Sequence, residues 1–255
     1  MEDSPRYAVE ATGTSIAVLE ALIDAPGPVG VTEVAEELDI AKSVVHNHVS
    51  TLRAAGYVTK RGTEYGPSAR ILALGDRIRR GFPVYRYSKE AVDNLAAATG
   101  ETTLLAVREG SHAVPIYIAD GTTEWSRPFG VGEQLPLHAT APGKCLAASL
   151  PDDTLEDVLL DASPEQFTDT TTTDAPTLRT ELRRVRDDGF AFCRSEHIEG
   201  VVGVAAPVPE TESSRPAALG VCGPARSLSG RYLEEDNTGQ VLSTTKTIQV
   251  ALADD

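Results

Sequence analysis

The sequence predicts an α+β protein built from two domains that are joined by helices. A length of 255 residues exceeds one domain of average size, and an apolar content of 41% is enough for two hydrophobic cores. Three helical patterns and a hairpin pattern fill residues 1–67, helical patterns continue over residues 68–98, and strand patterns cluster in residues 99–255. Because those strands do not alternate strictly with helices, a parallel βαβ sheet is not expected.

Composition narrows the class of protein. No run approaches the roughly 18 apolar residues of a membrane-spanning helix. The acidic, polar start of the chain, from Met1 to Arg6, is unlike a secretion signal. The three cysteines form no CxxC pair, which argues against a disulfide framework and against a zinc ribbon. We therefore expect a soluble cytoplasmic protein without a membrane partner.

The first domain begins with two short helices. Three apolar residues recur at helical spacing: Ile16, Leu19 and Ile23. This spacing predicts a helix over residues 14–24 with Thr14 or Ser15 as its N-cap. A Pro/Gly break at residues 25–28 ends this helix, and a second helix is expected from residue 31 with Thr32 as its N-cap. Its inward residues would be Val34, Ala35 and Leu38.

A third helix is predicted from about Lys42 to Ala55. Its buried stripe has the spacing i, i+4, i+7 and consists of Val45, Val49 and Leu52. Gly56 is expected to end the helix in the left-handed conformation. Residues 57–66, with a turn at 61–63, are typical of a β-hairpin. Three helices and a hairpin are the outline of a winged helix-turn-helix domain.

Patterns in the remaining chain predict further helices and strands. The helical stretch at 68–98 contains a break at Gly81-Phe82-Pro83. Other helices are expected at residues 141–150 and 152–161, after a cap at Asp174, and at residues 231–252. Strands are expected at residues 102–107, 113–119, 189–194, 201–208 and 217–221.

The charge distribution contains one exception to a strongly acidic chain. The net charge is −15; residues 1–80 carry 9 basic and 11 acidic side chains, and residues 81–255 carry 14 and 27. Within residues 42–61 there are four basic residues and no acid, which is typical of a nucleic-acid contact. The chain has only 5 Lys against 18 Arg, and this acidic, lysine-poor composition is what a halophilic organism with a salty cytoplasm would favour.

The face of the third helix opposite its buried stripe suits a DNA major groove. It presents Lys42, Ser43, His46, Asn47 and Ser50. Asparagine can bond adenine through two hydrogen bonds, and Lys60 and Arg61 at the hairpin tip suit the phosphate backbone. For any one residue, a solvated helix face is the alternative. The agreement of turn, helix, hairpin and charge predicts binding to double-stranded DNA.

Residues 135–144, with the sequence LPLHATAPGK, place small residues just before a predicted helix start. The free N–H groups and the dipole of such a start can hold a carboxylate or a phosphate. The alternative is a tight turn with Lys144 in solvent. The GxxxxGK[ST] pattern of a phosphate-binding loop is absent.

Two later segments, residues 189–200 and 218–224, combine glycine, cysteine and small residues. They either line a cavity or form core strands with buried thiols. Glu196 and His197 lack an accompanying nucleophile elbow, and Cys193 with His197 supplies only two metal ligands. We therefore expect no catalytic, metal or cofactor site. A hydrolase or transferase would need a nucleophile–base pair, while a redox- or metal-responsive sensor using Cys145, Cys193 and Cys222 stays open.

The order of these segments resembles the IclR family of transcriptional regulators. The matching segments are AKSVVHNH at 41–48, AGYV at 55–58, LPLHATAPGK at 135–144, EHIEG at 196–200 and GPAR at 223–226. The resemblance extends from about residue 14 to residue 252, and the composition resembles that of a haloarchaeal member.

The resemblance implies a ligand-responsive DNA-binding regulator that is not an enzyme. A dimerising winged helix would bind a palindromic operator. A GAF-like C-terminal domain, an antiparallel sheet flanked by helices, would bind a small organic effector. Family effectors are mostly carboxylates, sugar acids and aromatic compounds, and assembly is as a dimer or tetramer.

The resemblance also implies the pocket. Its positions are Ala139, Thr140, Ala141, Gly143, Cys193, Val201, Gly203, Gly220 and Cys222. Polar residues are frequent in the family where this chain has Cys193, Gly220 and Cys222, so a less polar pocket is expected. Arg127 is a candidate partner for a carboxylate. Together these features predict a small organic acid with a partly apolar body, such as an aromatic acid or a deoxygenated sugar acid.

Overall fold

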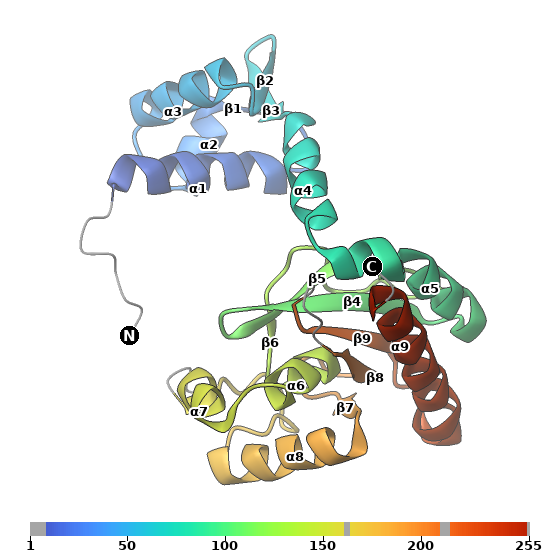
Figure 1. The fold of residues 1–255 in the computed structure, drawn as a ribbon. Coiled ribbons are helices and arrows are strands. Elements are labelled where there is room, and N and C mark those ends of the chain that lie inside the picture. Colours follow the sequence, from blue (N-terminus) through green and yellow to red (C-terminus); the bar gives the residue numbers. More distant parts are fainter. Residues whose placement is uncertain (1–8, 161–163, 210–214, 254–255) are drawn as a thin grey trace. The chain divides into compact units, whose positions relative to one another are not determined.

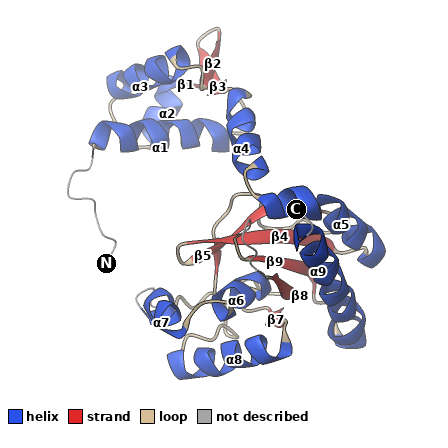
Figure 2. Cartoon of the chain, viewed as in Figure 1, coloured by secondary structure: helices blue, strands red, loops and turns tan. Residues whose placement is uncertain are grey.

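The computed structural model describes residues 9–160, 164–209 and 215–253. The chain divides into two compact units, Met1–Ile78 and Arg79–Asp255. The predicted α+β class is confirmed, with a helical N-terminal unit and a C-terminal antiparallel sheet that is flanked by helices (Figures 1 and 2). Within the described residues, no helix combines the length and apolarity needed to span a membrane.

The N-terminal unit packs three helices against a small sheet. The helices are α1 (Glu10–Asp24), α2 (Val31–Glu37) and α3 (Lys42–Ala54), and α4 (Arg70–Arg80) follows the sheet. The strands are β1 (Val29–Gly30), β2 (Val58–Arg61) and β3 (Glu64–Pro67), in the antiparallel order β1-β3-β2. The core includes Val18, Leu22, Val34, Val45, Val49 and Tyr65.

The start of α1 differs from the prediction. The helix begins at Glu10, and Thr14 lies inside it, where its hydroxyl donates to the Glu10 carbonyl at 3.0 Å. Ser15 bonds the Ala11 carbonyl in the same way. Hydroxyl side chains serve both as caps and as partners of the i−4 carbonyl, so their presence alone does not locate a helix start.

The buried face of α1 consists of Val18, Ala21 and Leu22, and Leu19 is partly buried against the same core. The other two residues of the predicted helical spacing, Ile16 and Ile23, are 52% and 46% exposed. The spacing predicted the helix, whereas tertiary contacts decided which of its apolar residues are buried. A surface stripe of this kind is available for another contact.

Two further local predictions in this unit are corrected. The N-cap of α2 is Gly30 rather than Thr32, and the Gly30 N–H donates to the Glu33 carboxylate at 3.2 Å. The hairpin turn is confined to Gly62 and Thr63, because Arg61 and Glu64 already pair across the strands. The left-handed end of α3 is confirmed, since Gly56 has a φ of +83°.

The C-terminal unit is built on a six-stranded antiparallel sheet in the order β6-β5-β4-β9-β8-β7. The strands are β4 (Thr102–Glu109), β5 (His112–Ala119), β6 (Leu135–Pro136), β7 (Ala191–Arg194), β8 (Val201–Val208) and β9 (Ala217–Pro224). One face is covered by α5 (Pro83–Thr99) and by α9 (Thr238–Ala253), which follows a π-helical segment, Tyr232–Asn237 (Figure 1). The other face carries α6 (Ala141–Ala148), α7 (Asp152–Leu160) and α8 (Ala175–Asp188).

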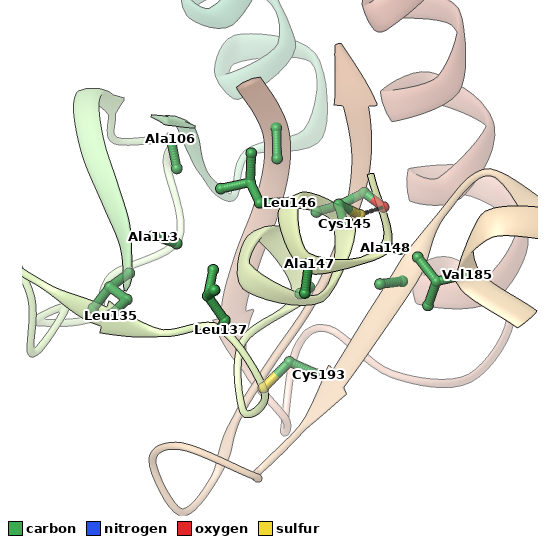
Figure 3. Close-up of a cluster of buried hydrophobic side chains, with 14 of the residues drawn as sticks. Ala106, Ala113, Leu135, Leu137, Cys145, Leu146, Ala147, Ala148, Val185 and Cys193 are labelled. Carbon is green, nitrogen blue, oxygen red and sulfur yellow. Dashed lines mark hydrogen bonds between the residues drawn. The ribbon is translucent and has the colours of Figure 1, made fainter. Parts of the chain in front are cut away.

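Alternation along the central strand β4 assigns its side chains to two cores. Leu104 and Ala106 pack into the core under α6, while Leu105 and Val107 pack into the core under α5 and α9. Figure 3 shows the first core, in which α6 contributes Cys145, Leu146, Ala147 and Ala148. Every residue of α6 is buried, so this helix lies inside the unit rather than on its surface. Residue 161 of the predicted helix 152–161 lies outside the described residues.

Candidate functional site

The first candidate site is the exposed face of α3 in the N-terminal unit. Val45 and Val49 are buried on the inner side of the helix and fix which side faces outward. His48 is half-buried, and its Nδ1 lies 2.8 Å from the Ser15 hydroxyl of α1. The outward side chains are those of Lys42, Ser43, His46, Asn47 and Ser50. The structure therefore exposes all five predicted groove residues on one helix.

The hairpin beside α3 exposes Lys60 and Arg61. Lys60 Nζ lies 5.1 Å from the ring centroid of Tyr65, whose buried side chain anchors the hairpin to the core. Arg61 is paired in register with exposed Glu64. Because opposite charges across strands attract, Glu64 weakens the positive field at the hairpin tip. The segment 42–61, which contains no acidic residue, ends three residues before Glu64, so the charge count for this segment leaves the carboxylate out.

The second candidate site is a cavity in the C-terminal unit, on the α6 side of the sheet. It offers about 50 Å³ to the centres of water-sized molecules. A single water needs about 10–15 Å³ on this measure, so a small organic molecule fits. The lining residues are Leu104, Phe129, Leu135, Thr140, Ala141, Pro142, Cys193, His197, Ile198, Val201, Val202, Gly203, Val221 and Cys222.

Six of the ten predicted effector residues line this cavity: Thr140, Ala141, Cys193, Val201, Gly203 and Cys222. Three of them share one row across neighbouring strands, because Gly203 pairs with Cys193 on β7 and with Cys222 on β9. A Cβ at Gly203 would lie 2.6 Å from the Val221 carbonyl oxygen, so only glycine fits there. The small side chains in this row leave space for the cavity above the sheet.

The other four predicted residues support the cavity or lie beside it. A Cβ at Gly143 would lie 2.6 Å from the Pro136 carbonyl oxygen, and a Cβ at Gly220 would lie 3.2 Å from Pro142 Cγ. Ala139 accepts a hydrogen bond from the Cys193 thiol through its carbonyl, at 3.2 Å. Gly143 and Gly220 are therefore small because other chain atoms pass close to them, while Ala139 supports the cavity through its backbone carbonyl.

Arg127 is not among the cavity-lining residues. Its Nε donates to Asp120 Oδ1 at 3.0 Å, and its Nη1 donates to the Phe129 carbonyl. The guanidinium is thus already bonded to a carboxylate of its own chain. Arg127 supports the Phe129 segment of the wall, and its charge acts on the thiol of Cys222, one of the lining residues.

The turn before α6 uses its own hydrogen-bonding groups. The Thr140 hydroxyl accepts from the Gly143 N–H at 3.1 Å and donates to the Pro136 carbonyl at 2.8 Å. Thr140 is therefore the N-cap of α6. Pro142 has no N–H, so two of the donors that an anion would need are absent or occupied. The anion cradle expected from the sequence is correspondingly weak.

Lys144 is buried, which excludes the solvated side chain of the alternative interpretation of residues 135–144. Its Nζ donates to Glu181 Oε1 of α8 at 2.6 Å, to the Phe192 carbonyl at 3.1 Å and to the Glu196 carboxylate. Burial alone would lower the pKa of Lys144, but the charges of Glu196 and Glu181 outweigh it and raise the pKa. The ammonium stays charged and joins α6 and α8 to the loop after β7.

The loop after β7, residues 195–200, forms part of the cavity wall through His197 and Ile198. Three threonines on the preceding loop hold it in place: Thr168, Thr170 and Thr171 donate to the carbonyls of residues 194–196. From the sequence, the glycine- and cysteine-rich segment 189–200 was a candidate cavity wall, while Glu196 and His197 were considered individually only as acid–base or metal candidates. The structure places His197 and Ile198 of this segment in the cavity lining.

The three cysteine thiols stay protonated at neutral pH in this fold. Burial raises the pKa of the Cys145 thiol to about 12 and also raises the pKa of the Cys193 and Cys222 thiols. Because the thiolate is the form that oxidises and binds metals, these thiols are poor redox or metal ligands near neutral pH. The described residues contain no group of three or more His, Cys, Asp or Glu side chains arranged to hold a metal ion.

The fold and the two sites define a class of protein: a winged helix-turn-helix unit followed by a helix-flanked sheet that contains a small-molecule cavity. Comparisons with known proteins agree. The IclR helix-turn-helix domain matches residues 15–62, and the domain described as bacterial transcriptional regulator IclR C-terminal matches residues 80–250. The chain belongs to the IclR family of transcriptional regulators, and it is therefore a regulator rather than an enzyme.

Individual relatives have low sequence identity to this chain. The chain is 27% identical over 255 residues to the HTH-type transcriptional repressor AllR of Salmonella typhi, and the aligned region covers 98% of this chain and 93% of that protein. The crystal structure of Thermotoga maritima IclR has a TM-score of 0.83 at 23% identity and covers 96% of this chain and 99% of that chain. An IclR homologue from Microbacterium hydrocarbonoxydans, solved with 4-hydroxybenzoate, has a TM-score of 0.78 at 20% identity, with 96% and 100% covered.

Proposed function

We propose that this regulator binds a palindromic operator in double-stranded DNA as a dimer or a dimer of dimers, and that a small organic acid in the cavity modulates this binding. The single observation that supports the DNA-binding part of this proposal is the outward face of α3. A helix whose inner side is fixed by Val45 and Val49 presents Asn47, His46 and three other polar side chains together.

Symmetry supports the palindrome. Each chain carries one recognition helix, so two copies related by a two-fold axis would meet two inverted half-sites. The charge distribution supports contact through the N-terminal unit alone. The part of the chain from residue 81 onward carries 14 basic against 27 acidic side chains, which repels a phosphate backbone.

Two observations support a small organic effector. The cavity is lined by mostly apolar side chains and has room for a small molecule. The homologue from Microbacterium hydrocarbonoxydans was solved with 4-hydroxybenzoate, an aromatic acid. The raised pKa of all three thiols gives no support to a cysteine-based sensor.

The experiment is selection of bound duplexes from a random DNA pool by the full-length protein, followed by fluorescence anisotropy on the selected sequence. An inverted repeat should be enriched. Asn47→Ala should weaken binding by about 1–3 kcal/mol and relax one base position in each half-site. Asn94→Ala, at an exposed position on α5, is the matched control and should bind like the parent.

Lys60→Ala and Arg61→Ala test the hairpin in the same assay. Each should weaken all sequences similarly and reduce the salt dependence of binding by about one phosphate contact. Enrichment without an inverted repeat, or an unchanged footprint with Asn47→Ala, would contradict the proposed arrangement.

A further inference from the structure

Two side chains in the cavity lining have unused hydrogen-bonding capacity, the His197 imidazole and the weakly polar Cys222 thiol. None of its lining residues is Lys, Arg, Asp or Glu. Among the polar lining residues, Thr140 uses its hydroxyl as donor and as acceptor, and the Cys193 thiol donates to the Ala139 carbonyl. Within the described part of the chain, the ring nitrogens of His197 have no hydrogen-bond partner. His197 is therefore the strongest donor and acceptor among the residues that line the cavity.

The loop that carries His197 is held in a fixed position. The residue before it, Glu196, is bonded to the buried Lys144 ammonium. Thr168 Oγ1 donates to the Ser195 carbonyl at 2.7 Å, and the Gly200 N–H donates to Ser195 Oγ at 3.1 Å. An imidazole on a loop fixed at several points is preorganised for recognition, because little freedom is lost when a ligand binds.

Aromatic contacts set the orientation of the ring. The edge of one ring meets the face of the other between His197 and Phe167, with centroids 4.9 Å apart and an interplanar angle of 88°. Phe167 also stacks on His138 at 5.7 Å. The Nε2 atom of His138 is already hydrogen-bonded to the Glu165 carbonyl, at 2.9 Å. Within the described residues, the ring nitrogens of His197 have no such partner.

Several titratable groups surround His197. Burial, and next the nearby His138, lower its pKa, while Glu165 opposes this shift. Of the other neighbours, Glu196 is paired with Lys144, and the Cys193 thiol stays protonated because its pKa is raised. In the empty cavity the imidazole is consequently neutral at neutral pH.

We propose that His197 receives the carboxylate of the effector and takes up one proton from solvent when the acid binds. This inference rests on the effector function proposed above and identifies the residue that recognises the acid. A carboxylate enclosed without a positive partner is strongly disfavoured, and no lining residue is a permanent cation. A carboxylate beside the ring stabilises the imidazolium, and the resulting ion pair carries no net charge. The apolar walls and the small volume select an acid with a short apolar body.

The sign of the pH effect follows from proton uptake. Because the bound state holds one more proton than the free state, affinity for the acid rises as the pH falls toward the pKa of the free imidazole. The affinity changes by up to tenfold per pH unit where uptake is complete. An uncharged amide of the same shape does not stabilise the imidazolium, so its affinity does not change with pH.

The test is isothermal titration of the full-length protein with two matched pairs, butyrate with butyramide and 4-hydroxybenzoate with 4-hydroxybenzamide, at pH 6, 7 and 8. Titration in two buffers of different ionisation enthalpy counts the protons taken up by the parent, so this result depends on no variant. We expect at least one acid to bind with uptake approaching one proton and with at least tenfold loss of affinity from pH 6 to pH 8. Both amides should show no pH dependence.

Two variants complete the test. His197→Gln should bind the acid at least tenfold more weakly and should lose the pH dependence. His112→Gln on β5, a histidine outside the cavity lining, should behave like the parent. Acid binding without proton uptake, or equal binding by His197→Gln, would overturn this inference and leave the proposed function intact. Failure of every acid and amide to bind a protein that still binds its operator would overturn both the inference and the acidic effector.

Discussion

At the scale of single residues, Lys144 is a buried charge that holds parts of the fold together. Its side chain is 1% exposed and touches two carboxylates, Glu181 and Glu196. Both the desolvation cost and the Coulomb gain are large in such a place, and removing one partner leaves the other uncompensated. The residue sits in α6, whose first turn lines the cavity, so the pair also connects the cavity wall to the core.

We predict that Lys144→Met lowers the free energy of unfolding by about 3–5 kcal/mol, because it leaves the Glu196 charge buried without a partner. Urea unfolding at pH 7 measures this change. Adding Glu196→Gln should recover part of the loss. Lys89→Met is the matched control: Lys89 pairs with Asp93 at 2.7 Å, but its side chain is 51% exposed, so the loss should be much smaller than at Lys144. Equal losses at both lysines would contradict the role of burial.

Glu101 is a buried carboxyl with an unsatisfied oxygen. The residue is 2% exposed, its Oε2 lacks a hydrogen-bond partner, and burial raises its pKa although hydroxyls of Thr123 and Ser227 oppose the shift. The folded protein therefore holds this proton more tightly than the unfolded chain does. The associated stability is present at low pH and is lost as the pH rises from about 4.5 through the raised pKa.

We predict that Glu101→Gln stabilises the protein by about 1 kcal/mol or more at pH 7, because the amide stays neutral. Near pH 4, where Glu101 is protonated, the variant and the parent should unfold at similar denaturant concentrations. Thermal or urea unfolding across pH 4–8 measures the difference. Glu109→Gln, at the exposed end of β4, the strand that follows Glu101, should show no such trend. A variant that is less stable at pH 7 would show that the charge is stabilising.

At the scale of elements, α1 exposes two apolar side chains that are seven residues apart. Ile16 and Ile23 are 52% and 46% exposed, and Val9, the residue just before the helix, is 68% exposed. This spacing is that of one seam position in a coiled coil, and large apolar side chains in such a row are typical of an interface. A second copy of the chain is the partner that the proposed symmetric operator requires.

We predict that Ile16→Glu shifts the protein from dimer or tetramer toward smaller species, because it places a charge in this seam. Light scattering at micromolar concentration and high salt measures the mass. Ala11→Glu, also exposed on α1 but turned about 140° from Ile16, should leave the mass unchanged. A parent that is monomeric under these conditions, or an Ile16→Glu variant of unchanged mass, would contradict a seam on α1.

At the scale of the whole molecule, charge is the dominant property. A net charge of −15 on 255 residues disfavours the compact state through repulsion. Salt screens this repulsion, since the Debye length falls from about 10 Å at 0.1 M to about 3 Å at 1 M. Most of the excess acid lies beyond residue 80, so the C-terminal unit should respond most.

We predict that the Tm rises by at least about 2–4 °C, corresponding to about 1 kcal/mol, between 0.1 M and 2 M KCl. Differential scanning calorimetry measures this rise. Sucrose at matched osmolality carries no charge and controls for stabilisation by exclusion from the surface. If sucrose stabilises the protein as strongly as KCl, or if KCl lowers the Tm, charge repulsion is not what limits stability.

The sequence by itself determined the elements whose signals are local. The end of α3 at Gly56, the start of α5 at Pro83 and the cap of α8 at Asp174 each depend on residues within one helical turn. The Asp174 carboxylate accepts from the Thr177 N–H at 3.0 Å, as the spacing of a cap predicts. Resemblance to a family then supplied the fold and six positions of the cavity wall.

Only the tertiary structure decided which groups meet. Lys144 and Glu196 are 52 positions apart, so no local pattern pairs them. The two-residue strands β1 and β6 have too little sequence to show alternation and exist because a longer strand lies beside them. The buried face of α1 was set by contact with α2 and α3 rather than by its most apolar side chains. Local propensity acts within a few residues, whereas burial, pKa and a free imidazole at a cavity depend on what the folded chain brings together.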